Sequence, residues 1–283
     1  MTPADPIDEV TAAVLATAKY AAVCPDTVHS LATVELRTTP STREAIKRVK
    51  RKLHQIGGAY QAGRMPYARW LAELRTAPDR AALLAVAQRV MAAHASSRER
   101  LPNLDEFYEH VLAPLGPIER MLDLACGLNP LAIPWMGLAP TTRYDCIDIY
   151  SDQMAFLQEW LHLIGQPGLA TCQDALLTPP SGAYDVILLL KTVPCLQQID
   201  APATERLLGA LQARQLVVSF PAYSLGGRSV GMVTNYSRGF EALLTRLGLS
   251  GRSQLIGDEL VYIINCRSPE SPEHPAQPSR KDT

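Results

Sequence analysis

The sequence predicts an α/β protein with a doubly wound sheet, preceded by a helical segment. The first hundred residues lack the alternating apolar pattern of a strand, whereas strands alternate with helices from residue 118 onward. The run Tyr184–Leu190 is continuously apolar and suits the interior of a parallel sheet. Two later strand-like runs are joined by Gly257-Asp258, which predicts an antiparallel hairpin closing the sheet.

Helical periodicity dominates the first part of the chain. Apolar residues recur at helical spacing from Ile7 to Leu36, and Pro25 interrupts them. Ser41, with Glu44 three residues on, predicts a helix start with a capping box, and Gly57-Gly58 predict its end. Further helices are expected at 67–74 and 79–95 and from Asn103 onward.

The second part alternates strands with helices. Strands are expected at 118–124, 144–148, 169–173, 184–190, 215–220, 253–256 and 260–265. Helices are expected after Asn129, as an N-cap followed by Pro130, and at 152–164, 203–213 and 237–247. Parallel strands joined by helices place their carboxyl ends at one edge, where ligands bind.

Length and composition set the broad class. With 283 residues, 47% of them hydrophobic, the chain can form one large or two modest domains. No apolar run is long enough to span a bilayer, and the start lacks the pattern of a secretory signal, so we expect a cytoplasmic protein with no membrane partner. The six cysteines form no Cys-x-x-Cys pair, which favours reduced, buried thiols and no metal site.

Three segments are expected. A helical domain covers 1–102, an α/β domain covers 103–266, and a tail rich in Pro, Ser and charge at 267–283 is predicted to be disordered.

Positive charge is concentrated in the helical segment, although the whole chain has a net charge of −1. From Arg43 to Arg100 there are 13 Lys or Arg residues against four acids. Five of these cations fall within six residues: Lys47, Arg48, Lys50, Arg51 and Lys52. So dense a cluster with so few acids favours phosphate contact over an ordinary solvated face, and hence a polyanionic partner.

The stretch Ile118–Pro130 has the pattern of an apolar strand, a tight small-residue turn and a helix start. Gly127 supplies the backbone freedom of the turn. The pattern Asp123-x-Ala125-x-Gly127 lacks the three spaced glycines of the dinucleotide fingerprint. It resembles motif I of S-adenosylmethionine-dependent methyltransferases.

Acidic residues follow two of the other strands. Asp148 ends the second strand, twenty-five residues after Asp123, where an acid accepts hydrogen bonds from ribose hydroxyls. Asp174, after the third strand, matches the acid that meets the adenine amino group in many methyltransferases. Lys191 directly follows an apolar strand, which indicates a side chain reaching a solvent-filled cleft.

Several blocks of sequence resemble the aminoglycoside-resistance 16S rRNA methyltransferases, which modify N7 of guanine 1405 in the decoding site. The blocks are 97–102, 104–108, 123–132, 134–138, 188–192, 194–196 and 224–226. The resemblance implies a class I methyltransferase fold, with a seven-stranded sheet whose last strand is antiparallel. It also implies S-adenosylmethionine as donor, the 30S subunit as substrate and an N-terminal domain that docks on rRNA. Separately, we expect a monomer.

The resemblance assigns roles to individual positions. Arg100 would pair with the methionine carboxylate of the cofactor. Lys191 and Gln197 would lie at the catalytic edge, although relatives can carry Glu at Gln197 and Lys at Tyr223. The implied cofactor contacts are Tyr60, His94, Ala95, Ser96, Arg100, Ala125, Gly127, Asp148, Asp174, Ala175, Leu190 and Gln198.

The implied acceptor determines the expected mechanism. Guanine N7 carries an exposed lone pair, so no general base is required, and catalysis rests on positioning. A guanine in structured RNA must be flipped out and stacked on an aromatic ring, for which Tyr108, Tyr223 and Tyr236 are candidates. The alternatives are the same chemistry on another base, such as adenine N1, or on a small molecule, or a non-catalytic rRNA-binding module. The basic segment disfavours the small molecule, and the motif acids disfavour the idle module.

Overall fold

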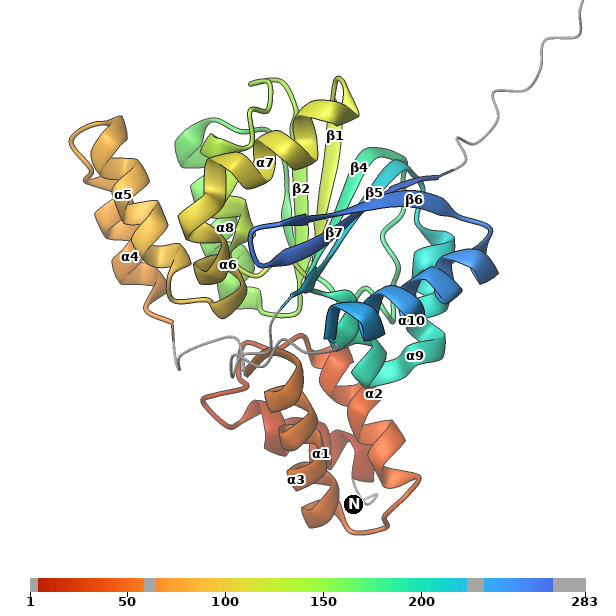
Figure 1. Cartoon of the computed structure of the whole chain (residues 1–283). Helices are drawn as coiled ribbons and strands as arrows, with labels where there is room; N and C mark the ends of the chain where they lie inside the picture. The colour runs from red at the N-terminus through yellow and green to blue at the C-terminus, as the bar shows by residue number, and fades with distance from the viewer. Residues whose placement is uncertain (1–4, 59–64, 223–231, 267–283) are drawn as a thin grey trace, which may run out of the picture.

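The computed structural model describes residues 5–58, 65–222 and 232–266. Within them, seven strands form one sheet in the order β3-β2-β1-β4-β5-β7-β6 (Figure 1). Strands β1 to β5 run parallel, and β7 is antiparallel to both β5 and β6. The strands are β1 (Arg120–Leu124), β2 (Arg143–Asp148), β3 (Ala170–Cys172), β4 (Tyr184–Leu190), β5 (Ala213–Pro221), β6 (Ser250–Ile256) and β7 (Glu259–Asn265). The predicted fold class is confirmed.

Helices precede the sheet and cover both of its faces (Figure 1). The α-helices are α1 (Pro6–Leu15), α2 (Pro25–Leu36), α3 (Thr42–Leu53), α4 (Tyr67–Arg75), α5 (Arg80–Met91), α6 (Ala95–Arg100), α7 (Leu104–Leu112), α8 (Ser151–Ile164), α9 (Val193–Ala210) and α10 (Met232–Leu247). Short helical turns are the π-helix η1 (His54–Gly58) and the 3₁₀ turns η2 (Leu101–Asn103), η3 (Ala113–Leu115) and η4 (Asn129–Trp135).

The pleat of the sheet sends alternate side chains into two separate cores. Met121 on β1 points to one face and packs in a cluster with Trp160 of α8 and the side chains of α7. Leu122, the next residue, points to the other face and packs in a cluster with Leu207 of α9 and Phe240 of α10. The continuous apolar strands therefore reflect burial on both faces, as the sequence predicted.

The helical residues before the α/β domain contribute to two cores. Helices α1, α2 and α3 have their own cluster, which includes Val10, Val28 and Val49. We call residues 6–53 the N-terminal lobe; it lies beyond the end of the sheet in Figure 1. In contrast, α4 and α5 pack through Trp70 and Val90 into the same core as Trp160. The predicted unit 1–102 is thus helical where described, but it is divided between two packing units.

The predicted start of α3 is half confirmed. The hydroxyl of Ser41 accepts the backbone N–H of Glu44 at 3.3 Å, as an N-cap does. The capping box is not closed, because the Ser41 N–H donates to Thr39 Oγ1 and the Glu44 carboxylate pairs with Arg48. A cation one turn further on therefore takes the acid that the box requires.

Two other local predictions are wrong. Asn129 is no N-cap, because it is itself the first residue of a 3₁₀ turn and its side chain is bonded to Arg100 and Asp123. The helix expected at 203–213 begins at Val193 and bends at Asp200, whose φ of −157° is not helical. Asp200 then caps the second half by accepting the Ala203 N–H at 2.8 Å.

Candidate functional site

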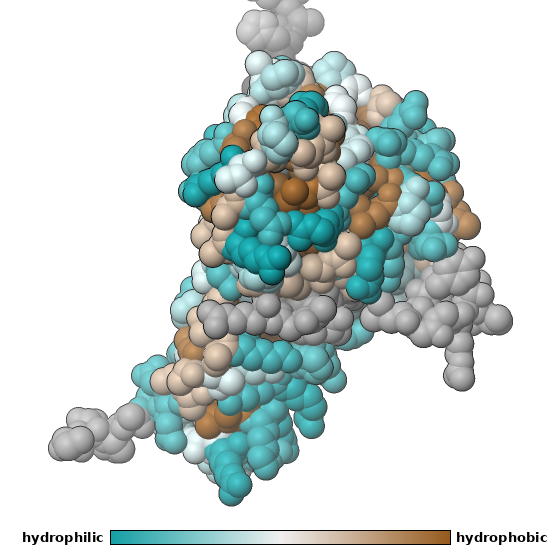
Figure 2. Space-filling model, turned by 90° about the vertical axis from the view of Figure 1, so that its left-hand side faces the viewer, coloured by the Kyte–Doolittle hydropathy of each residue, from teal (hydrophilic) through white to brown (hydrophobic). Residues whose placement is uncertain are grey.

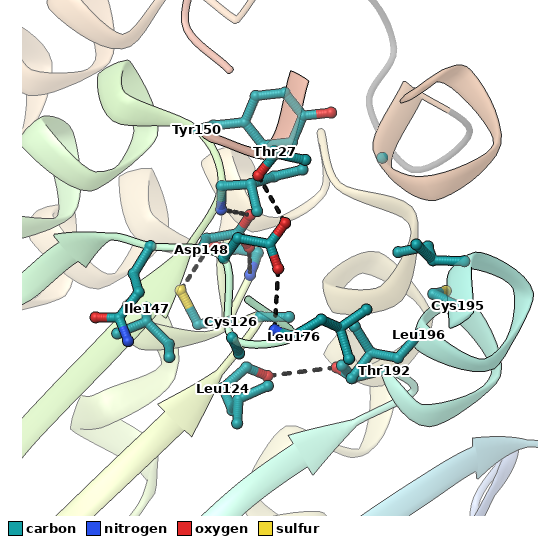
Figure 3. Close-up of a pocket in the computed structure, with 18 of the residues that line it drawn as sticks. Thr27, Leu124, Cys126, Ile147, Asp148, Tyr150, Leu176, Thr192, Cys195 and Leu196 are labelled. Carbon is teal, nitrogen blue, oxygen red and sulfur yellow. Dashed lines mark hydrogen bonds between the residues drawn. The ribbon is translucent and has the colours of Figure 1, made fainter. Parts of the chain in front are cut away.

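The carboxyl ends of β1, β2 and β4 meet at a cavity of ≈ 250 Å³ (Figure 3). Asp148 and Thr27 lie at one end of this pocket, and Cys195 and Leu196 lie toward the other. The structure brings ten of the predicted catalytic and cofactor-binding residues to its lining, together with Lys52, which was predicted to contact rRNA. The ten are His94, Ser96, Arg100, Ala125, Gly127, Asp148, Asp174, Ala175, Leu190 and Lys191.

The turn after β1 brings backbone close to the cavity. Ala125 and Gly127 both have positive φ, at 51° and 53°. A Cβ atom on Gly127 would lie 2.7 Å from Cε1 of His94, so only glycine fits here. Burial and then the charges of Arg100, Arg98 and Lys191 lower the pKa of His94 to about 4, which keeps its ring neutral at pH 7.

Backbone donors fix the carboxylate of Asp148. Its Oδ2 accepts the Gly127 N–H at 2.9 Å, and its Oδ1 accepts the Ile149 N–H at 2.7 Å. Burial raises the pKa of Asp148, and these two N–H groups oppose that rise. Each oxygen keeps further acceptor capacity toward the cavity.

Two donors likewise hold the carboxylate of Asp174, and one of them is distant in sequence. The Leu176 N–H donates to Oδ1 at 2.9 Å, and the Thr27 hydroxyl donates to Oδ2 at 2.7 Å. Thr27 lies on α2, 147 residues away in sequence. Nothing in the sequence indicated this residue.

Arg100 is buried in a pair that sequence reasoning missed. Its Nε and Nη2 donate to the two carboxylate oxygens of Glu259, each at 2.9 Å, and its Nη1 donates to Asn129 Oδ1 at 2.8 Å. Burial alone would lower the pKa of Arg100, but the charge of Glu259 outweighs it and the pKa is raised. Burial would likewise raise the pKa of Glu259, but Arg100 and Lys191 lower it. Both groups stay charged.

Lys191 borders the cavity with its charge already paired. It has a φ of 60° and is only 5% exposed. Its Nζ donates to Glu99 at 2.6 Å and lies 3.3 Å from Glu259. The Lys191 side chain thus neither extends to bulk solvent nor lies free in a cleft, and Glu259 joins it to Arg100.

Asp123 of motif I also lines the cavity and is held by two buried donors. Its Oδ2 accepts Tyr144 Oη at 2.7 Å and Asn129 Nδ2 at 2.8 Å. Asn129 also accepts from Arg100, so the motif acid and the arginine are joined through one amide. Burial raises the pKa of Asp123 to about 7, against the hydrogen bonds from Asn129 and Tyr144, which lower it.

We expect Asp123→Asn to change how stability depends on pH. Because the folded-state pKa is raised, the wild type is penalised as pH rises from about 4 through about 7. Asparagine carries no such charge and can still accept from Tyr144 and Asn129. The melting temperature of the variant should therefore gain on the wild type between pH 4 and pH 8. A difference that stays constant over this range in thermal denaturation would contradict the assignment.

Some predicted residues lie elsewhere. Gln197 and Gln198 are exposed on α9; Gln197 lines a separate hollow beside Arg246, and neither lines the cavity. Ala95 is buried and does not line it either. Tyr60 and the 224–226 block lie outside the described residues.

The aromatic candidates for base stacking are reduced by the structure. Tyr108 is buried and donates to Asn129 Oδ1 at 2.5 Å, so its candidacy as the ring that stacks on the target guanine is wrong. Tyr236 is partly buried and stacks on Phe220 with ring centroids 5.3 Å apart. Tyr223 lies outside the described residues.

The cations of the basic helix α3 have more acidic partners than the sequence suggested. Arg48 and Lys52 both pair with Glu35 of α2, at 3.8 Å and 2.7 Å, and Lys47 lies 4.0 Å from Glu44. Lys50 and Arg51 enter none of the ion pairs of the described chain, and the lobe presents a mainly hydrophilic surface in Figure 2. The cluster therefore contains two cations that remain available to a partner.

All six cysteines are free; Cys24, Cys126 and Cys146 are buried, as predicted, whereas Cys172, Cys195 and Cys266 are half-buried. The described helices include none with the length and apolar character needed to cross a bilayer.

Comparison with known proteins identifies the family of this chain. The model of the ribosomal RNA methyltransferase (FmrO) family matches residues 16–263. The chain belongs to this family. Among FmrO relatives, the 16S rRNA (guanine(1405)-N(7))-methyltransferase of Frankia casuarinae is 41% identical over 91% of this chain and 93% of its own length. The enzyme of the same name from Micromonospora echinospora is 38% identical, covering 93% and 97%.

Solved structures agree with this membership. The 16S rRNA methyltransferase RmtF in complex with S-adenosyl-L-homocysteine aligns with a TM-score of 0.82 at 34% identity, covering 92% of this chain and 98% of that one. The 16S rRNA methylase RmtB aligns with a TM-score of 0.77 at 30% identity, covering the same shares. The family resemblance expected from the sequence is confirmed.

Proposed function

We propose that this protein transfers the methyl group of S-adenosylmethionine to N7 of guanine 1405 in the 16S rRNA of the 30S subunit, and thereby confers aminoglycoside resistance. The observation that carries the proposal is a cavity at the carboxyl edge of the sheet that is lined by both Asp148 and Asp174, in a chain that belongs to the FmrO family. We further propose that it works as a monomer in the cytoplasm.

The residues of the cavity fit the cofactor. Asp148 can accept from ribose hydroxyls and Asp174 from the adenine amino group, since each carboxylate oxygen accepts one protein donor and has a second lone pair for a ligand. Arg100 has five N–H groups, of which three donate to Glu259 and Asn129. The remaining two can donate to the carboxylate of the methionine part.

Chemistry at this site requires positioning more than proton transfer. Bound S-adenosylmethionine supplies an electrophilic methyl group on a sulfonium. Guanine N7 is unprotonated and needs no base. The protein therefore has to hold donor and acceptor in line, a task to which the rigid Arg100–Glu259–Lys191 network contributes. Of the two residues predicted at the catalytic edge, Lys191 lines the cavity, so we propose it as the neighbour of the reacting atoms.

The direct test is to map methylated positions in 16S rRNA after expression in a susceptible bacterium. N7 methylation at guanine 1405, with growth on aminoglycosides, is the expected result. Methylation at another base, such as adenine N1, would move the chain to a different specificity. An unmodified rRNA would contradict the proposal.

Asp148→Ala is expected to weaken binding of S-adenosylhomocysteine by about a hundredfold. The variant removes acceptors for two ribose hydroxyls, and hydrogen bonds to a charged group contribute about 1.5 kcal/mol or more each. Isothermal titration calorimetry measures the change. Asp152→Ala is the matched control, because Asp152 is an exposed acid four residues away that does not line the cavity. Equal affinities of Asp148→Ala and wild type would remove Asp148 from the ribose site.

Reversing two charges on α3 is expected to weaken docking and spare the cofactor. Lys50→Glu with Arg51→Glu should lower 30S affinity steeply and reduce its salt dependence, because phosphate contacts are lost. Binding of S-adenosylhomocysteine should be unchanged. The control pair is Arg214→Glu with Arg252→Glu, which makes the same charge change at two exposed positions on β5 and β6, outside the lobe. Filter binding at several salt concentrations that gives the same result for both pairs would assign the docking role elsewhere.

A further inference from the structure

The N-terminal lobe forms one wall of the cavity. Helix α2 contributes Thr27, Ser30, Leu31 and Val34, and α3 contributes Lys52. Thr27 lies beside Tyr150 and above Asp148 in Figure 3. None of these five residues was predicted as a cofactor contact, although Lys52 was predicted to contact rRNA. Thr27 lies at the end of the pocket that holds Asp148.

The lobe is also joined to the α/β domain directly after Asp148, which ends β2 and is the acid proposed to bind the ribose. The Cys24 N–H donates to the Ile149 carbonyl at 2.7 Å, and Val23 forms an antiparallel bridge with Tyr150. The Ser151 N–H donates to the Ala22 carbonyl at 2.8 Å. Any shift of α2 therefore moves the backbone that directly follows Asp148.

A side chain of the lobe completes the second acid. Thr27 is 4% exposed, and its hydroxyl donates to Asp174 Oδ2. The other oxygen is held by the Leu176 backbone, so the rotation of the carboxylate about its bond is set from two sides. One of those sides belongs to the N-terminal lobe, which has its own core and against which Ile149, Tyr150 and Ile199 of the α/β domain also pack.

Apolar side chains border the same opening. Val34 of the lobe and Leu177 after β3 are each 44% exposed, and both line the cavity. A flat ring such as adenine that covers part of either side chain would gain free energy by removing apolar surface from water.

We propose that Thr27 is a positioning residue for the adenine of the cofactor, and that through it cofactor binding and 30S docking are energetically coupled. The inference rests on the proposed function. A cofactor that is bound by Asp174 stabilises the position of α2, and an rRNA surface that holds the lobe stabilises the same position. By linkage, each ligand must then raise the affinity of the other by the same factor.

The first test asks whether Thr27 acts through Asp174. Thr27→Val removes the hydroxyl at nearly constant volume, Thr27→Ser retains it, and Thr33→Val is a matched control on α2 outside the cavity. Calorimetry is done with S-adenosylhomocysteine and with S-inosylhomocysteine, which has a carbonyl in place of the adenine amino group. We expect Thr27→Val to weaken the adenosine ligand by about tenfold and the inosine ligand much less. Thr27→Ser and Thr33→Val should retain the preference of the wild type.

The outcomes separate a positioning role from a structural one. A purely structural loss in Thr27→Val would weaken both ligands by the same factor and leave the base preference intact, which would overturn the proposal. Unchanged binding of S-adenosylhomocysteine by Thr27→Val would overturn it too. If the wild type itself fails to bind S-adenosylhomocysteine, the proposed function fails and this inference fails with it.

The second test measures the coupling with the full chain and intact 30S subunits. We expect saturating 30S to tighten S-adenosylhomocysteine binding by at least about fivefold, and saturating S-adenosylhomocysteine to tighten 30S binding by the same factor. In Thr27→Val both factors should fall toward one. Wild-type affinities that do not depend on the other ligand would refute the coupling, even if 16S rRNA is methylated as proposed.

Discussion

Replacing Arg100 with Met is expected to destabilise the protein by about 3–5 kcal/mol and to abolish measurable cofactor binding. The guanidinium and the Glu259 carboxylate are 2% and 4% exposed as side chains, and they share two hydrogen bonds of 2.9 Å. Removing one partner leaves a charge in the interior that Lys191 and Ser219 only partly compensate. The free energy of unfolding from chemical denaturation gives the measurement.

A second pair in the same protein supplies the control. Arg246 and Glu205 also form a bidentate pair, with hydrogen bonds of 3.0 Å and 2.9 Å, but this pair lies on the surface. Water and salt screen such a pair, so Arg246→Met should change stability little. The double variant Arg100→Met with Glu259→Gln should lose less stability than the sum of the two single losses, because it removes both charges of the pair and leaves neither unpaired in the interior. Strictly additive losses would mean that the two buried side chains do not interact energetically.

The sequence predicted the sheet well because strands that are buried on both faces leave an unambiguous apolar signal. Tyr184–Leu190 was predicted with the bounds that the structure gives. Asp148 and Asp174 were placed at the cavity for a second reason, since a residue at or just after the end of a parallel strand lies at the ligand edge whatever its other contacts.

The partners of those residues could not be predicted in the same way. Glu259 reaches Arg100 from 159 residues away, and Thr27 reaches Asp174 from 147. Local periodicity contains no information on such pairs. One signal was present and unused: Glu259 is an acid at the start of a run of apolar residues, and a buried acid needs a cationic partner.

The division of the helical segment was missed for a related reason. Helical spacing identifies an apolar face but not the surface that it covers. Val10 and Trp70 both lie on such faces, yet one belongs to the lobe and the other to the core beneath the sheet. The basic helix shows the same limit, because Glu35, which pairs with Arg48 and Lys52, comes from a different helix.

Intact 30S subunits are expected to be methylated at least about a hundredfold faster than naked 16S rRNA or a short hairpin that carries the same guanine. The catalytic domain needs only one base, but the lobe beside the cavity mouth presents Lys50 and Arg51 outside any ion pair of the described chain. Losing two charge-assisted contacts with phosphates, at about 1.5 kcal/mol each, already corresponds to about a hundredfold in affinity.

The comparison of substrates also tests where specificity is located. Structured RNA is recognised largely by its shape and backbone, so docking geometry would select the guanine, with little reading of the bases around it. The Lys50→Glu, Arg51→Glu variant should then methylate 30S slowly and the hairpin no more slowly than wild type does, because the hairpin never reaches the lobe. Initial rates of methyl transfer from radiolabelled S-adenosylmethionine measure both effects. Efficient methylation of the isolated hairpin by the wild type would instead place the specificity in the pocket around Lys191.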